Sequence, residues 1–111
     1  MIKSFTLAKR IASLTQEEYL KYWRETHGPL AAKVIPGVRR YVQNHPIKIP
    51  GYEFEIDGIT EMWWDNLESL QNYLAWRQSD KGKILIEDEK KFSDSNRRRR
   101  FFAVEYVIKE R

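Results

Sequence analysis

Apolar and polar residues alternate along four stretches of the chain, and this alternation predicts half-buried β-strands. The four stretches are residues 2–11, 38–45, 58–65 and 99–109. Two stretches between them carry the residue patterns that begin helices. The pattern therefore predicts four strands and two helical regions.

The first helical region opens with a capping box at Thr15–Glu18, in which the side chain at each end satisfies a backbone N–H at the other. Gly28-Pro29 disturbs this helix near its end. A further turn or two should follow before Pro36-Gly37 stops it.

The second helical region begins with another capping box, with Asp65 as the predicted cap and Glu68 as its partner. We expect this helix to reach about Ser79 and the charged stretch 80–91 to continue as irregular helix. Residues 46–57, rich in Pro, Gly and Lys, are expected to form a loop.

The predicted order is strand, helix, strand, strand, helix, strand. In a chain of 111 residues, this order implies an α+β, ferredoxin-like fold, with an antiparallel sheet that carries both helices on one face. Chains of this length usually form one domain, so we expect a single domain over residues 1–111.

Large apolar residues fall on both faces of the predicted sheet, because Trp63-Trp64 and Phe101-Phe102 are adjacent pairs. Two helices cover only one face, and an apolar patch of this size is not expected to remain in water. We predict a homodimer that packs sheet face against sheet face. The alternative is a monomer whose 46–57 loop folds across the second face.

Composition narrows the function classes. The chain has no cysteine, which excludes disulfides, a thiolate nucleophile and Cys-ligated metal. The net charge of +4 comes from Arg97–Arg100, since without these arginines basic and acidic residues balance at 16 each. We interpret this run as a solvated start of the last strand that could pair with the acidic residues 87–89, and expect no nucleic-acid binding.

The N-terminus lacks a signal-peptide core and no apolar run could span a membrane, so we expect a cytoplasmic protein.

His27 is the first candidate for chemistry. It precedes Gly28-Pro29, where the helix is disturbed, so its ring could enter the gap between helix and sheet. An imidazole can accept or donate a proton near neutral pH. The simpler interpretation is a helix-terminal histidine that only satisfies carbonyl groups.

Strand 38–45 offers a second group of polar residues. Its two-residue period places Tyr41, Gln43 and His45 on one face, together with Arg39. The donors and acceptors of these side chains could orient a small polar ligand. The alternative is a solvated outer face.

Glu61 is an acidic residue between Ile59 and Trp63 on one face of the third predicted strand. Paired with His27 or His45, its carboxylate could orient the imidazole or act as an acid or base. The two histidines are 18 residues apart and match no metal-binding motif. Phosphate-binding and dinucleotide-binding motifs are also missing, so we expect neither a metal nor a cofactor.

Four segments together resemble the EthD-like family of small dimeric α+β barrel proteins. They are TQEEYLKYWRETHGPLAAK, PGVRRYVQNH, DGITEMWWDNLESL and KFSDSNRRRRFFAVEYVI, in this order over nearly the whole chain. The resemblance implies a ferredoxin-like subunit that dimerises through its sheet. The family is tied to the degradation of ethyl tert-butyl ether, and its members are often described as oxidoreductases. Similar proteins act in polyketide pathways as dehydratases, decarboxylases or oxygenases without a cofactor.

The resemblance also carries over to single residues, including His27 in the family's HGP segment. It matches Tyr41, Gln43 and His45 to the motif of the second strand and Asp57, Glu61 and Trp63 to that of the third. We expect His27, Tyr41 and Glu61 to be catalytic. The residues expected to bind substrate are Tyr19, Trp23, Gln43, His45, Asp57 and Trp63.

Together with the resemblance, these residues predict a small cofactor-independent enzyme of the oxidoreductase, dehydratase or isomerase type. His27 would be the general base, acting on an apolar, oxygenated, cyclic small molecule from catabolism or polyketide-like metabolism. Tyr19, Trp23 and Trp63 would form the walls of the pocket. The alternative is a binding or accessory protein that serves a partner oxygenase without catalysing a reaction.

Overall fold

A four-stranded antiparallel sheet forms one layer of the protein in a computed structural model that describes residues 1–111. The strands are β1 (Ile2–Ala8), β2 (Arg40–Asn44), β3 (Gly58–Trp64) and β4 (Arg99–Val104). Their order across the sheet is β2-β3-β1-β4, and β1 pairs antiparallel with both β3 and β4. This is the predicted α+β, ferredoxin-like fold.

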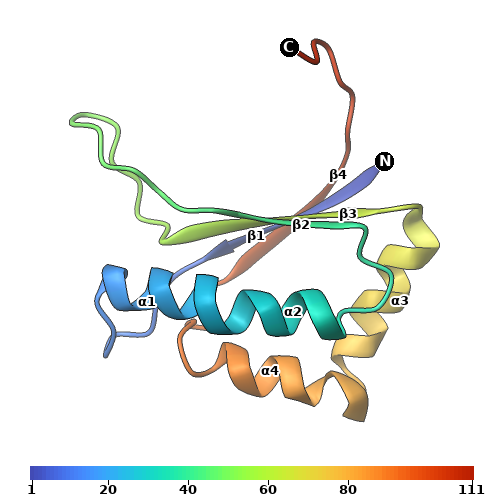
Figure 1. The fold of residues 1–111 in the computed structure, drawn as a ribbon, viewed down its shortest axis with the longest axis horizontal. Coiled ribbons are helices and arrows are strands. Elements are labelled where there is room, and N and C mark those ends of the chain that lie inside the picture. The colour runs from blue at the N-terminus through green and yellow to red at the C-terminus, as the bar shows by residue number, and fades with distance from the viewer.

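The helices form a second layer on one face of the sheet (Figure 1). The N-terminal run consists of α1 (Gln16–Tyr22), a π-helical turn η1 (Trp23–His27) and α2 (Gly28–Val34). The C-terminal run consists of α3 (Leu67–Arg77), the 3₁₀ turn η2 (Asp80–Gly82) and α4 (Lys83–Glu89). Helices on one face were predicted, and each helical run divides close to the predicted place, at Gly28-Pro29 and near Ser79.

The first helix begins at the predicted capping box and then continues through Gly28-Pro29. The Glu18 N–H donates to the Thr15 hydroxyl at 3.1 Å, and the Thr15 N–H donates to the Glu18 carboxylate at 2.9 Å. Pro29 lies in the first turn of α2, where its missing N–H costs little. The chain absorbs the change through the π-helical turn, in which the Gly28 N–H donates to the Trp23 carbonyl.

The cap of the second helix is Asn66 and not the predicted Asp65. The Asn66 side chain accepts a hydrogen bond from the Ser69 N–H at 2.8 Å. Asp65 is held instead by Arg39, whose guanidinium lies 2.8 Å from its carboxylate. The prediction failed because Asp and Asn are both good caps and the ion pair across the strand end decides between them.

The first and last strands in the chain are shorter than predicted. β4 ends at Val104 and not at Lys109, because its last pairing partner in β1 is Ile2. β1 ends at Ala8, after which only an isolated bridge joins Arg10 to Ser93.

The core lies between the sheet and the helices, and β3 supplies its largest residue. Thr60, Met62 and Trp64 point toward the helices and are buried. Trp64 stacks on Tyr73 of α3 with ring centroids 4.8 Å apart, and its indole N–H donates to the Ser4 hydroxyl at 3.1 Å. Burial of such aromatic surface is the main favourable contribution to folding.

The opposite face of the sheet is also aromatic, as predicted. Phe5 and Phe101 stack with ring centroids 4.5 Å apart, and half of the Phe101 surface is exposed. Trp63 lies beneath the cations of Lys3 and Arg40, at 4.4 and 4.5 Å from its ring. This outer face therefore combines aromatic rings with a few charges.

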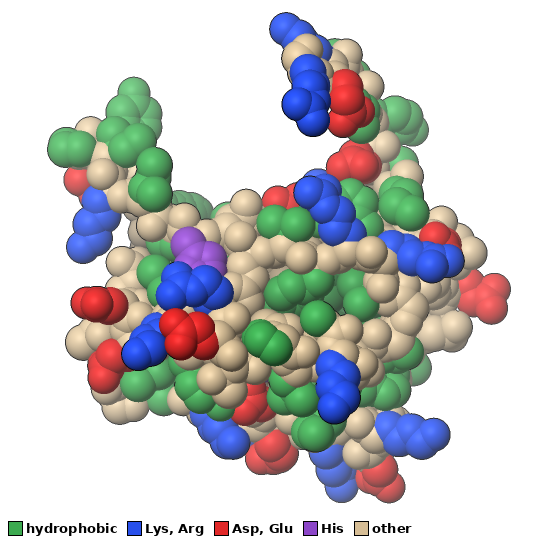
Figure 2. Space-filling model, viewed as in Figure 1, with side chains coloured by type: hydrophobic (Ala, Val, Ile, Leu, Met, Phe, Trp, Pro, Cys, Tyr) green, Lys and Arg blue, Asp and Glu red, His purple; other side chains and the backbone are tan.

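Two segments project from the outer face like arms: the 46–57 loop and the tail from residue 105 onward (Figure 1). Hydrophobic side chains gather on the loop (Figure 2), where Tyr52 is 82% exposed. The tail carries Ile108, which is 93% exposed. Because the loop points away from the sheet, the alternative of a loop folded across the second face is not what the structure adopts. No helix is long and apolar enough to cross a lipid bilayer.

Candidate active site

His27 faces Asp88 across the two helical runs. Its Nδ1 lies 2.8 Å from Asp88 Oδ2, and both side chains are buried. The π-helical turn places His27 on the inner side of its helix, whereas Asp88 comes from α4. The ring also packs against Phe92 with centroids 4.7 Å apart, which limits its rotation.

The Asp88 carboxylate is held in its charged form. The Tyr22 hydroxyl donates to Oδ1 at 2.6 Å, and the Lys91 ammonium lies 3.6 Å from the same oxygen. Burial raises the pKa of Asp88, but the hydrogen bonds from Tyr22 and His27 outweigh it and keep this pKa below its ordinary value. Burial and the bond to Asp88 raise the pKa of Tyr22 to about 12.

A charged Asp88 determines the tautomer of His27. A carboxylate can only accept hydrogen bonds, so Nδ1 of His27 carries the proton. In the neutral ring, Nε2 then has a free lone pair, and no protein group donates a hydrogen bond to it. This is the arrangement of a histidine general base oriented by a carboxylate.

His27 lines a cavity between the helices and the sheet, with a volume of about 40 Å³ for water-sized molecules. This space admits a few waters and is too small for a whole cyclic ligand. The lining combines aromatic and polar residues from both layers. Those that enter the argument below are Tyr19, Trp23, Tyr41, Glu89, Arg98 and Arg100.

Polar residues of β2, together with His45 just after it, form a connected ladder on one face of the strand, as its alternation predicted. Tyr41 lines the cavity, and the Gln43 amide donates to its hydroxyl at 3.3 Å and to the Trp23 carbonyl at 2.9 Å. His45 Nε2 lies 2.8 Å from the Gln43 side-chain oxygen, so His45 is the donor. Burial raises the pKa of Tyr41, which keeps its hydroxyl protonated.

Gln43 and His45 do not line the cavity, but both contact Trp23, which does. The His45 ring stacks on Trp23 with centroids 4.7 Å apart. Burial, followed by the nearby charge of Arg24, lowers the pKa of His45. This histidine therefore remains neutral and packs as an aromatic ring.

Glu61 and Trp63 lie on the outer face of the sheet, away from His27. The expected pairing of Glu61 with a histidine does not form, because β3 directs its even-numbered residues toward the helices. Glu61 is instead paired with Lys3 at 2.6 Å and accepts from Asn44 at 3.0 Å. Trp63 likewise cannot be a wall of the cavity.

Asp57 is buried but is also absent from the cavity lining. Its carboxylate accepts from the Arg10 backbone and guanidinium, both at 2.9 Å, and from Gln16 at 3.3 Å. These contacts tie the start of β3 to the segment after β1. In this position Asp57 stabilises the fold and does not line the cavity.

Sequence reasoning missed Asp88, Arg98 and Arg100. The arginine run was interpreted as a solvated entrance, but the alternation of a strand sends Arg98 and Arg100 inward to the cavity. The expected pairing with the acidic segment holds for Arg98, whose guanidinium is 3.4 Å from Glu89. No group of three or more acidic or histidine side chains is placed to hold a metal ion.

A sequence model of the EthD domain matches residues 12–96. A search of proteins with curated functions found no match. Among solved structures, an ethyl tert-butyl ether D (EthD) family protein from Bacillus halodurans is similar, with a TM-score of 0.73 and 26% identity. That match covers 96% of this chain and 99% of the other.

Two further structures share the fold at lower identity. A dimeric ferredoxin-like protein of unknown function from Bacteroides fragilis has a TM-score of 0.62 at 18% identity, covering 92% of this chain and 93% of the other. A variant of SnoaB, a cofactor-independent oxygenase from Streptomyces nogalater, has a TM-score of 0.61 at 10% identity, covering 97% of each chain.

Proposed function

The chain belongs to the EthD domain family, and we propose that it is a small enzyme that moves a proton on an oxygenated organic molecule without a cofactor. The observation that carries this proposal is the buried His27–Asp88 pair, which leaves Nε2 without a protein partner on a histidine that lines the cavity. The oxygenase activity in the description of SnoaB is compatible with such chemistry.

In the proposed reaction, the ligand binds with its α-carbon, the carbon atom next to a carbonyl group, beside His27. Nε2 accepts the proton as the C–H bond breaks, and the electron pair passes to the carbonyl oxygen as an enolate. Asp88 stabilises the imidazolium that forms. The Tyr41 hydroxyl donates to the enolate oxygen.

Proton removal of this kind can begin three of the expected reactions. Returning the proton to another carbon atom gives isomerisation. Expulsion of a hydroxyl group, which takes the proton from the imidazolium and leaves as water, gives dehydration. Attack of the enolate on molecular oxygen gives a hydroperoxide, which is the first product of a cofactor-independent oxygenation. The small cavity accepts the reacting group of the ligand, and the ring would have to displace Trp23 or occupy the cavity mouth. Tyr19 and Trp23 remain the proposed apolar walls.

We further propose that the protein is a homodimer joined through its outer sheet faces. The half-exposed Phe101 and the two projecting arms need a covering partner, and a neighbour with this fold is described as dimeric. A cytoplasmic location and a small hydrophobic ligand also remain proposals.

The proposed function can be tested before the natural substrate is known. The protein is incubated in D₂O with bicyclic ketones such as α-tetralone, and deuterium uptake next to the carbonyl is measured by mass spectrometry. We expect the wild-type protein to accelerate uptake and His27→Gln to lose about 10²–10⁴-fold of that acceleration. Glu25→Gln, on the exposed side of the same turn η1, is the control and should retain most of it. Equal uptake by wild type and His27→Gln would contradict the general base and favour a binding protein.

A further inference from the structure

Three guanidinium groups lie near the cavity, but only two of them contact its one lining carboxylate, Glu89. Arg77 holds Glu89 with two hydrogen bonds of 2.8 Å, and the Arg98 guanidinium lies 3.4 Å from the same carboxylate. Arg100 has no carboxylate within 4 Å, although it also lines the cavity. The protein itself therefore supplies fewer negative charges here than positive ones.

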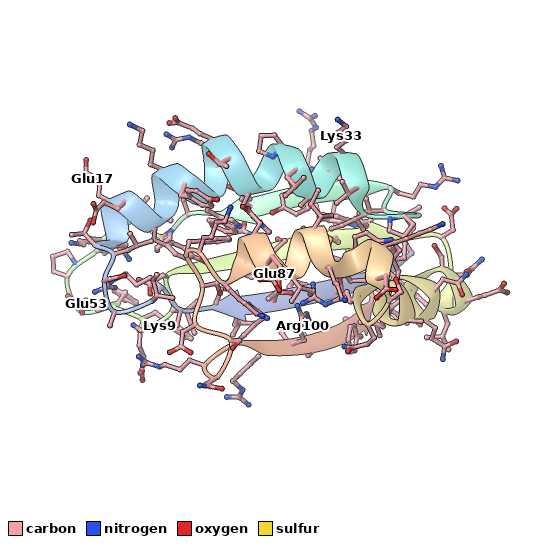
Figure 3. All side chains as sticks on the ribbon, turned by 90° about the horizontal axis from the view of Figure 1, so that it is seen from below. Lys9, Glu17, Lys33, Glu53, Glu87 and Arg100 are labelled. Carbon is pink, nitrogen blue, oxygen red and sulfur yellow. The ribbon has the colours of Figure 1, made fainter.

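Arg100 is largely enclosed despite its missing partner. Its Nε is buried and makes no hydrogen bond, and Figure 3 shows the side chain between β4 and α4. Burial, followed by the charge of Arg77, lowers the pKa of Arg100. An enclosed guanidinium without a counter-charge is costly, so such a group indicates a site that an anion completes.

Tyr19 supplies a second unused donor to the same cavity. Its hydroxyl is fully buried and has no hydrogen-bond partner. Burial raises the pKa of Tyr19, with a further contribution from the charge of Asp57, so the hydroxyl stays protonated. No carboxylate accepts a hydrogen bond from it: Glu89 accepts from Arg77, Asp88 accepts from Tyr22, and Asp57, whose charge acts on Tyr19, accepts from Arg10 and Gln16.

We propose that the cavity binds the carboxylate of an organic anion, with Arg100 and Tyr19 as its donors. A guanidinium edge matches the two oxygens of a carboxylate, and a group of this size suits a cavity of about 40 Å³. The inference rests on the proposed function and adds a substrate class to it. The ligand is then an apolar molecule with a carboxylate group. The carbon atoms next to that carboxylate lie in the part of the cavity that His27 lines.

The test is an NMR titration of the Arg100 Nε–Hε signal with acetate, using acetamide as the neutral probe of the same shape. We expect acetate to shift the signal saturably and acetamide to leave it unchanged. Arg100→Gln should weaken acetate binding, followed on the Trp23 indole signal, by about tenfold or more. Arg99→Gln removes the same charge from the neighbouring residue of β4, whose side chain is exposed, and should change the affinity by less than about twofold.

Two results would overturn the proposal: equal shifts with acetate and acetamide, or an equal loss of affinity in Arg99→Gln and Arg100→Gln. If Arg100→Gln does not fold, the wild-type comparison of the two probes decides alone. The failure of the anion site can be told from that of the proposed function. Acetate binding without deuterium uptake contradicts only the general base, and uptake without acetate binding contradicts only the anion site.

Discussion

The His27 imidazole and the Asp88 carboxylate lie 2.8 Å apart although 61 residues separate them in the chain. The contact joins the two helical runs where they border the cavity, and it makes Asp88 a positioning residue for the proposed base. Asp88→Asn keeps the shape of the side chain and removes the charge that selects the tautomer of His27.

We expect Asp88→Asn to lower kcat for deuterium uptake by about tenfold or more, with little change in KM, because the ligand does not touch Asp88. Asp80→Asn is the matched control, since it removes the same charge from an exposed side chain of η2. Equal kcat values for Asp88→Asn and wild type would contradict the positioning role.

The fold was more predictable than this pair of residues. Alternating strands and the Thr15–Glu18 capping box are local patterns, and local patterns identify elements well. The contact between His27 and Asp88 depends on how two helical runs pack, and no sequence spacing encodes it. Asp88 also lies in a charged, broken stretch, which gave no sign of a buried face.

The other wrong predictions at the site arose because the sequence does not show which face of the sheet points toward the helices. Both faces of β3 carry large residues, so the pattern alone could not tell that Trp64 faces the core and Glu61 the outside. For Arg98 and Arg100 a usable signal existed, because alternation must turn half of an arginine run at a strand start toward the helices. The single domain over residues 1–111 stays a prediction.

Acid should destabilise the protein through the helical carboxylates. Burial raises the pKa values of Asp88 and Glu89, but their ion pairs and hydrogen bonds keep both below the ordinary values. The stability they contribute is therefore present above the unfolded-state pKa and is lost as pH falls through the lower folded-state pKa. We expect the free energy of unfolding, from urea titrations, to decline below about pH 4. The decline should be shallower in Asp88→Asn, and an unchanged slope would contradict the assignment.

His45 should make stability sensitive to milder acid. Its pKa is lowered by burial, so the folded state favours the neutral ring that stacks on Trp23. The stability from this ring is fully present above the unfolded-state value of 6.5 and is lost as pH falls through the lower folded-state pKa. Urea titrations between pH 7 and pH 5 should show a decline that His45→Gln removes. A decline of the same size in the variant would assign it to other groups.

The proposed dimer should depend on the outer aromatic face. Phe101→Glu places a charge on this half-exposed face and should raise the dimer dissociation constant by about tenfold or more. Ile84→Glu makes the same kind of change at an exposed apolar residue of α4, on the helical side, and should leave the dimer intact. Analytical ultracentrifugation distinguishes the two, and a monomeric wild type would refute the sheet-to-sheet dimer.

In the proposed mechanism, Asp88 holds the Nδ1 proton of His27 and leaves Nε2 free to accept one from the ligand. Long-range ¹H–¹⁵N NMR of the histidine rings measures this tautomer directly in the wild-type protein, and Asp88→Asn assigns the effect to Asp88. At a pH where the ring is neutral, we predict a His27 signal pattern with the proton on Nδ1. A His27 ring protonated on Nε2 would contradict the claim, because its lone pair would then face Asp88 and not the ligand.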